Sequence, residues 1–72
     1  MSISVQIVTP ERPIYSGSCN EVRAPSAMGE IGILPGHRAL LAALDAGRVA
    51  IDSASGGSQR YAVSGGFIEV SN

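Results

Sequence analysis

Glycine and proline divide this chain into short segments, and that division limits what it can fold into. Turn-forming residues recur every eight to twelve positions along the chain. In residues 3–8, ISVQIV, the apolar residues Ile3, Val5 and Ile7 alternate with polar ones. This period-two pattern is typical of a strand with one buried face. The sequence therefore predicts an all-β fold rather than alternating strands and helices.

Six or seven short strands are expected. Pro10 and Pro13 interrupt the chain after the first strand, because each removes a backbone donor. Pro25 is expected to end a strand in the same way, and SGGS at residues 55–58 predicts a hairpin turn. Strands at this spacing favour an antiparallel β-sandwich. The further candidate strands are residues 14–16, 19–24, 48–54, 61–63 and 67–70.

Residues 37–47, HRALLAALDAG, depart from the strand pattern. Leu40, Leu41 and Leu44 have helical spacing, and Gly47 stands where a helix would end. Local evidence balances one or two helical turns against a strand, so both alternatives remain open.

Charge is sparse and mixed. The 72 residues carry six acidic side chains and five arginines, no lysine, and a formal net charge of -1. Hydrophobic residues make up 44% of the chain, which excludes an intrinsically disordered class. The arginines are spread along the sequence and are interpreted as solvated surface residues. Capture of nucleic acid or anionic lipid is therefore not expected.

Cysteine usage and hydropathy point to a location. Cys19 is the single cysteine, so no intrachain disulfide can form and a reducing compartment is favoured. The first residues lack the cationic region of a signal peptide, and the longest apolar run, residues 39–44, is far below the roughly 20 residues of a membrane helix. We expect a soluble, cytoplasmic protein without direct membrane insertion.

Known chemical motifs do not fit the chain. The glycines of GEIGILPGH, residues 29–37, match neither the dinucleotide fingerprint nor the phosphate loop. Ser64 lacks the preceding glycine of a nucleophile elbow. Histidine, cysteine and carboxylate spacings match no metal site, so no metal or cofactor is predicted. The glycines are interpreted as shaping a backbone that approaches another surface, with Glu30 an exposed carboxylate.

A thiol enzyme is the one catalytic hypothesis that the residues allow. An imidazolium beside a thiol lowers the thiol pKa and activates it as a nucleophile. Cys19 and His37 could form such a pair, but nothing in the sequence brings them together.

Three blocks stand in a recognisable order: VTPERPIYSG at 8–17, GEIGILPGH at 29–37 and SGGFIEV at 64–70. Over essentially its whole length the chain resembles the N-terminal domain of the epsilon subunit of bacterial and plastid F-type ATP synthase. The resemblance implies one antiparallel β-sandwich domain, residues 1–72, that has no active site and binds no cofactor. Such a domain lies at the foot of the central stalk, on the cytoplasmic face of the bacterial membrane or in the plastid stroma.

The same resemblance implies partners and contact residues. The domain grips the gamma subunit and rests on the membrane rotor ring, coupling the two during ATP synthesis. Gly29, Glu30 and Gly32 match positions that face the ring, and Thr9 and His37 match positions near gamma. An unrelated β-sandwich adaptor, binding another protein through the same glycine loop, is the alternative.

Two departures from the family affect these expectations. Prolines common in the family are replaced at Ala39 and in the pair Asp45 and Ala46, which leaves the conformation of residues 38–46 open. The family also continues with further strands and a C-terminal helical hairpin, whereas this sequence stops at Asn72. We therefore expect a sandwich that is incomplete at its C-terminal edge and has no such hairpin.

An incomplete sandwich has a consequence for association. If the final strand is missing, Phe67, Ile68 and Val70 lie near an unpaired sheet edge. Such an edge is a template for pairing with another chain, so self-association is predicted.

Overall fold

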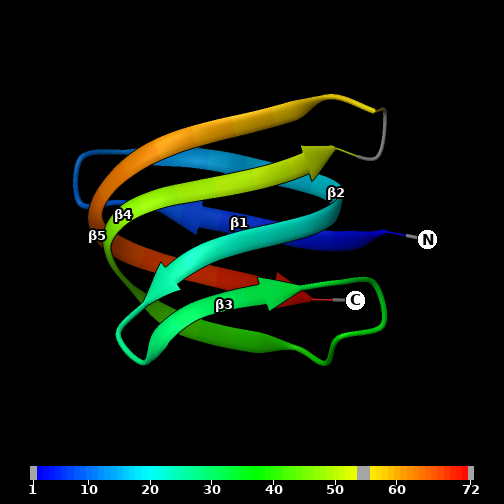
Figure 1. Cartoon of the computed structure of the whole chain (residues 1–72), viewed down its shortest axis with the longest axis horizontal. Coiled ribbons are helices and arrows are strands. Elements are labelled where there is room, and N and C mark those ends of the chain that lie inside the picture. The colour runs from blue at the N-terminus through cyan, green and yellow to red at the C-terminus, as the bar shows by residue number, and fades with distance from the viewer. Residues whose placement is uncertain (1, 54–55, 72) are drawn as a thin grey trace.

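The computed structural model describes residues 2–53 and 56–71, and in these residues every regular element is a β-strand (Figure 1). All strand pairings are antiparallel, which confirms the all-β prediction. This part of the chain contains no helix of the length and apolarity needed to cross a membrane. The strands are β1 (Ile3–Val8), β2 (Pro13–Ser26), β3 (Gly29–Ile33), β4 (Leu40–Ser53) and β5 (Ser58–Ser71).

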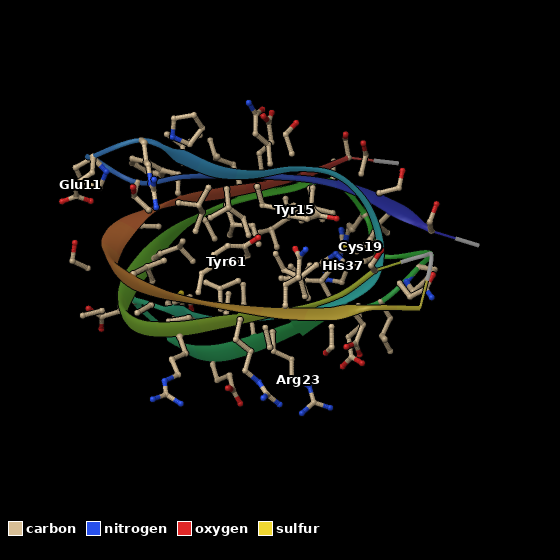
Figure 2. The ribbon with its side chains drawn as sticks, turned by 90° about the horizontal axis from the view of Figure 1, so that it is seen from above. Glu11, Tyr15, Cys19, Arg23, His37 and Tyr61 are labelled. Carbon is tan, nitrogen blue, oxygen red and sulfur yellow. The ribbon has the colours of Figure 1, made fainter. Side chains whose placement is uncertain are left out.

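The strands form one sheet that bends back on itself into two layers (Figure 2). The order is β1-β5-β4-β2-β3, and a further pairing of β1 with β2 closes the sheet. The long strands β2, β4 and β5 each bend from one layer into the other. Layer A contains β3, residues 22–26 of β2, the end of β4 and the start of β5. Layer B contains the start of β2, β1, the end of β5 and the start of β4.

Glycines mark the bend in β5. Gly65 and Gly66 have φ angles of 134° and 126°, a region that side chains with a Cβ avoid. A Cβ on Gly66 would overlap the backbone carbonyl oxygen of Val8. The end of β1 can therefore approach β5 closely only because residue 66 has no side chain.

The core lies between the two layers and receives side chains from all five strands. In β1 the predicted alternation is confirmed, because Ile3, Val5 and Ile7 are at most 3% exposed. The other buried apolar residues among those described are Cys19, Val22, Ala24, Ile33, Leu44, Val49, Ile51, Val63, Ile68 and Val70.

Residues 40–47 belong to β4, so the helical alternative for residues 37–47 was wrong. The segment pairs with β5 from Leu40 opposite Val70 to Gly47 opposite Val63. Its apolar residues alternate in burial, with Leu44 buried and Leu41 exposed. Cross-strand pairing and burial of one face outweigh the local preference of leucine and alanine for helix.

The predicted strands merge into longer ones, which is why five are found rather than six or seven. Residues 14–16 and 19–24 both lie in β2, and residues 61–63 and 67–70 both lie in β5. Residues 48–53 continue β4, while Ala54 of the predicted strand lies outside the described residues.

Pro25 does not end its strand. It pairs with Glu30 of β3, and on the side facing β4 the register shifts between Arg23 and Ser26. The missing backbone donor of proline therefore falls at an irregular part of the ladder, where it is tolerated.

A hairpin joins β4 to β5 as predicted. Gly56 has a φ of 99°, and the backbone nitrogen of Ser53 donates to the carbonyl oxygen of Gly57 at 2.7 Å. Ser55 of the predicted turn lies outside the described residues.

The predicted unpaired edge at Phe67, Ile68 and Val70 was wrong. These residues lie between two partners, since Ile68 pairs with Ile7 on one side and with Ala42 on the other. The bend at Gly65 and Gly66 carries the end of β5 into the middle of layer B. Self-association through this segment therefore loses its structural basis.

The bend at Gly65 and Gly66 leads to a prediction about the free energy of unfolding. We expect Gly66→Ala to lower the free energy of unfolding by about 2 to 4 kcal/mol, because the new Cβ is both strained and overpacked. Gly32→Ala is the matched control, since nothing lies within 4 Å of a Cβ there; its effect should stay within about 0.5 kcal/mol. Urea denaturation of both variants measures the difference. Equal stabilities would contradict the role given to Gly66.

Candidate protein-docking surfaces

The three residues assigned to the rotor ring lie together on β3, a strand that pairs only with β2 among the described strands. Gly29 begins the strand with a φ of 110°, and the Oγ of Ser26 donates to its carbonyl oxygen at 2.6 Å. Glu30 is opposite Pro25 and exposed. Gly32 is also exposed, and because it has no side chain its backbone is accessible. GEIGI is thus an exposed edge strand rather than a loop.

Thr9 uses its hydroxyl within the β1–β2 connection. The Oγ1 donates to the carbonyl oxygen of Arg12 at 2.7 Å and accepts from the backbone nitrogen of Arg12 at 3.2 Å. Only 8% of Thr9 is exposed. Its side chain therefore shapes the turn beside layer B instead of presenting a free hydroxyl.

His37 lies in the β3–β4 connection and is exposed. Its backbone nitrogen donates to the carbonyl oxygen of Leu34 at 3.1 Å, and its Nδ1 lies 2.7 Å from the carbonyl oxygen of Arg38. The β1–β2 and β3–β4 connections are at opposite ends of the fold (Figure 1). The structure therefore does not bring Thr9 and His37 together, although each adjoins a strand of layer B.

Between these two ends, layer B carries an exposed apolar patch that sequence reasoning missed. Phe67 of β5 pairs with Val8 of β1 on one side and with Ala43 of β4 on the other. Leu41 lies two residues from Ala43 on the same face of β4. The turn that contains Met28 is held against β4 because the backbone nitrogen of Ala27 donates to the carbonyl oxygen of Ala43 at 3.3 Å. We call Val8, Met28, Leu41, Ala43 and Phe67 the apolar patch.

Exposure distinguishes this patch from scattered surface residues. Met28 is 98% exposed, Leu41 68% and Phe67 57%. A groove of about 420 Å³ runs beside it, lined by Met28, Ile31 and the residues at the start of β4. Contiguous exposed apolar area of this kind marks protein-binding surfaces. The sequence held one signal for it, the apolar Met28 in an otherwise small, polar turn.

Cys19 and His37 do not form an activated pair. Cys19 is fully buried with the core, whereas His37 is on the surface. Burial raises the pKa of the Cys19 thiol, and the charge of Asp52 raises it further. An activated thiolate needs the opposite shift. No grouping of side chains suited to hold a metal ion occurs among residues 2–53 and 56–71.

The burial of Cys19 leads to a prediction about the rate at which its thiol is alkylated. In the folded chain at pH 7.5, iodoacetamide should alkylate Cys19 at least about 100-fold more slowly than in 8 M urea, because the thiol is both buried and protonated. Mass spectrometry of quenched samples follows the reaction. Because the folded pKa is raised, folding stability should also fall as pH rises above about 8.5, the ordinary thiol pKa. Rapid alkylation of the folded chain would restore the thiol-enzyme hypothesis.

Comparison with known proteins identifies the fold's relatives. Residues 2–72 match the family described as the ATP synthase delta/epsilon chain, β-sandwich domain. The ATP synthase epsilon chain of Synechococcus sp. (strain WH7803) is 46% identical over 70 residues, covering 97% of this chain and 51% of the relative. That of Nitrosococcus oceani is 43% identical over 70 residues, covering 97% and 50%. That of Micrococcus luteus is 44% identical over 68 residues, covering 94% and 75%.

The chain spans about half the length of the first two relatives and three quarters of the third. The match covers all five strands, including the exposed edge strand β3 and the segments that form the apolar patch. The chain therefore belongs to the epsilon-chain family of ATP synthase, within the part that forms that family's β-sandwich domain.

Proposed function

We propose that this chain is a non-catalytic component of the central stalk, which links the gamma subunit to the membrane rotor ring and transmits torque between them. Membership of the epsilon-chain family supports a place in the ATP synthase complex. The observation that carries the finer proposal is the apolar patch on layer B, which adjoins the turn of Thr9 at one end and the loop of His37 at the other.

Gamma is the partner proposed for the apolar patch. Fully burying a large apolar side chain contributes about 1.5 to 3 kcal/mol. Phe67, Leu41 and Met28 together therefore supply enough apolar area to anchor an interface, while the polar rim fixes its register. In this arrangement Thr9 acts by fixing the shape of the turn, and His37 offers a ring nitrogen to the partner.

The rotor ring is the partner proposed for the exposed edge of β3. Glu30 presents a carboxylate that can accept hydrogen bonds, and Gly29 and Gly32 allow another backbone to approach closely. A contact of this kind is polar and small, so it orients the two partners more than it binds them. One β-sandwich domain then bridges two partners with different surfaces.

The location follows from the partners. A chain attached to both gamma and the ring is a peripheral component on the cytoplasmic face of the bacterial membrane. The chain itself binds no nucleotide or metal in this proposal, because its contribution to ATP synthesis is mechanical.

A binding measurement tests the gamma contact. We expect Leu41→Ser and Phe67→Ser each to weaken binding to the purified gamma subunit of the same organism at least about tenfold in calorimetric titration, because each removes a buried apolar anchor. Circular dichroism confirms that the variants remain folded.

Leu34→Ser is the matched control. Leu34 is 56% exposed but lies outside the apolar patch, so its loss should change the dissociation constant less than about twofold. If the parent chain does not bind gamma at all, the adaptor alternative replaces this proposal. If Leu34→Ser weakens binding as much as Leu41→Ser, the patch is not the gamma surface.

A further inference from the structure

Three arginines that are far apart in the sequence gather on the solvent face of layer A. Arg23 of β2 is opposite Ala50 of β4, and Ala50 is opposite Arg60 of β5. Arg48 lies two residues before Ala50 on the same face and pairs with Ala62 of β5. Figure 2 shows Arg23 pointing outward from this layer. The sheet thus places three guanidinium groups around a floor of alanine methyl groups.

Two of these arginines carry charge that the described residues do not neutralise. The Nε of Arg23 donates to Glu21 at 3.0 Å. The neighbouring carboxylate of Asp52 accepts a hydrogen bond from Ser58 at 2.9 Å. Within the described ranges, no carboxylate forms an ion pair with Arg48 or Arg60. Both have exposed side chains and therefore present free, planar donors to solvent.

The face is hollowed beside Arg60. A shallow pocket of about 160 Å³ lies there, lined by Arg23, Arg60, Ala50, Ser58 and the carboxylates of Glu21 and Asp52, while Arg48 lies outside it. Arg48 and Arg60 occupy diagonal positions on the neighbouring strands β4 and β5. Residues in such diagonal positions are about 7 to 8 Å apart. The long side chains can converge from there on one carboxylate or on two adjacent ones. Arginine is the side chain best suited to bidentate binding of such groups.

The surrounding charges distinguish among anions. Glu21 and Asp52 form a row along one side of the arginines, and Glu30 of β3 lies on the same face. These carboxylates would repel a continuous polyanion such as nucleic acid, whereas a short acidic segment can meet the arginines alone. The mixed pattern also favours one orientation of the partner, because a wrong register places like charges together.

We infer that the solvent face of layer A is a second docking surface, and that Arg48 and Arg60 bind an acidic segment of a neighbouring subunit. The inference rests on the proposed function, because it places the partner within the synthase. This surface faces away from the apolar patch and is continuous with Glu30, so the ring-side contact extends from the edge of β3 across the sheet.

The absence of lysine from the sequence makes a sharp cross-linking experiment possible. A water-soluble carbodiimide joins a carboxylate to an amine but not to a guanidinium. Arg48→Lys and Arg60→Lys each introduce one side-chain amine at the proposed surface. Ser18→Lys is the control, since Ser18 is exposed on β2 opposite Ser4, outside both layer A and the apolar patch. Each variant is assembled with the purified remaining subunits, treated with carbodiimide and analysed by mass spectrometry.

We expect an amide bond between the introduced amine at position 48 or 60 and an Asp or Glu of a neighbouring subunit. Its yield should exceed that from Ser18→Lys at least about fivefold at 50 mM salt and fall at 500 mM, because exposed charges are screened. The parent chain, treated identically, reports any linkage through the N-terminal amine.

Loss of charge gives an independent measurement. The double variant Arg48→Gln and Arg60→Gln should assemble with about tenfold lower affinity at 50 mM salt and about the parent affinity at 500 mM. Assembly without cross-links above the control, or affinity unchanged in the double variant, overturns this inference and leaves the proposed function standing. Failure of the parent chain to assemble overturns both.

Discussion

The antiparallel pairing of β4 with β5 is the interaction on which the other features depend. It runs from Leu40 opposite Val70 to Asp52 opposite Ser58, and so extends through both layers. Because the two strands bend together, one continuous ladder of backbone hydrogen bonds holds the layers in fixed relation. The same register places Ala43 beside Phe67 on layer B and Ala50 beside Arg60 on layer A. A shift of one residue in the register of either strand would abolish both surfaces, because it would turn every side chain of that strand to the opposite face.

The two layers present different physical surfaces outward. Layer B exposes large apolar side chains, whose burial supplies affinity with little directional preference. Layer A exposes charges of both signs, which contribute less to affinity than to orientation and to the rate of encounter. The proposed function would use both surfaces, one to hold a partner firmly and the other to orient a second partner. The thin core between the layers keeps the surfaces at a fixed separation.

Polar groups near the core are used to shape the fold. The hydroxyl of Thr9 closes the β1–β2 connection on Arg12, and that of Ser26 closes the turn before β3 on Gly29. No side-chain polar atom buried in the described residues lacks a partner. The buried Cys19 behaves likewise as a packing residue, with a thiol pKa raised by its surroundings. The candidate binding groups are therefore those that the fold leaves exposed, chiefly Glu30, His37 and the arginines of layer A.

The sequence by itself determined the all-β class, the burial of Ile3, Val5 and Ile7, the hairpin around Gly56, and the family, because these depend on alternation and spacing within short segments. It placed Gly29, Glu30 and Gly32 in a loop, whereas the structure has them on strand β3. Only the tertiary structure decided that residues 40–47 are a strand, that Phe67 lies between two partners, and that Arg23, Arg48 and Arg60 share a face. Those outcomes depend on which strands pair and in what register. Such pairing is set by contacts between residues far apart in the chain, which a local pattern does not record.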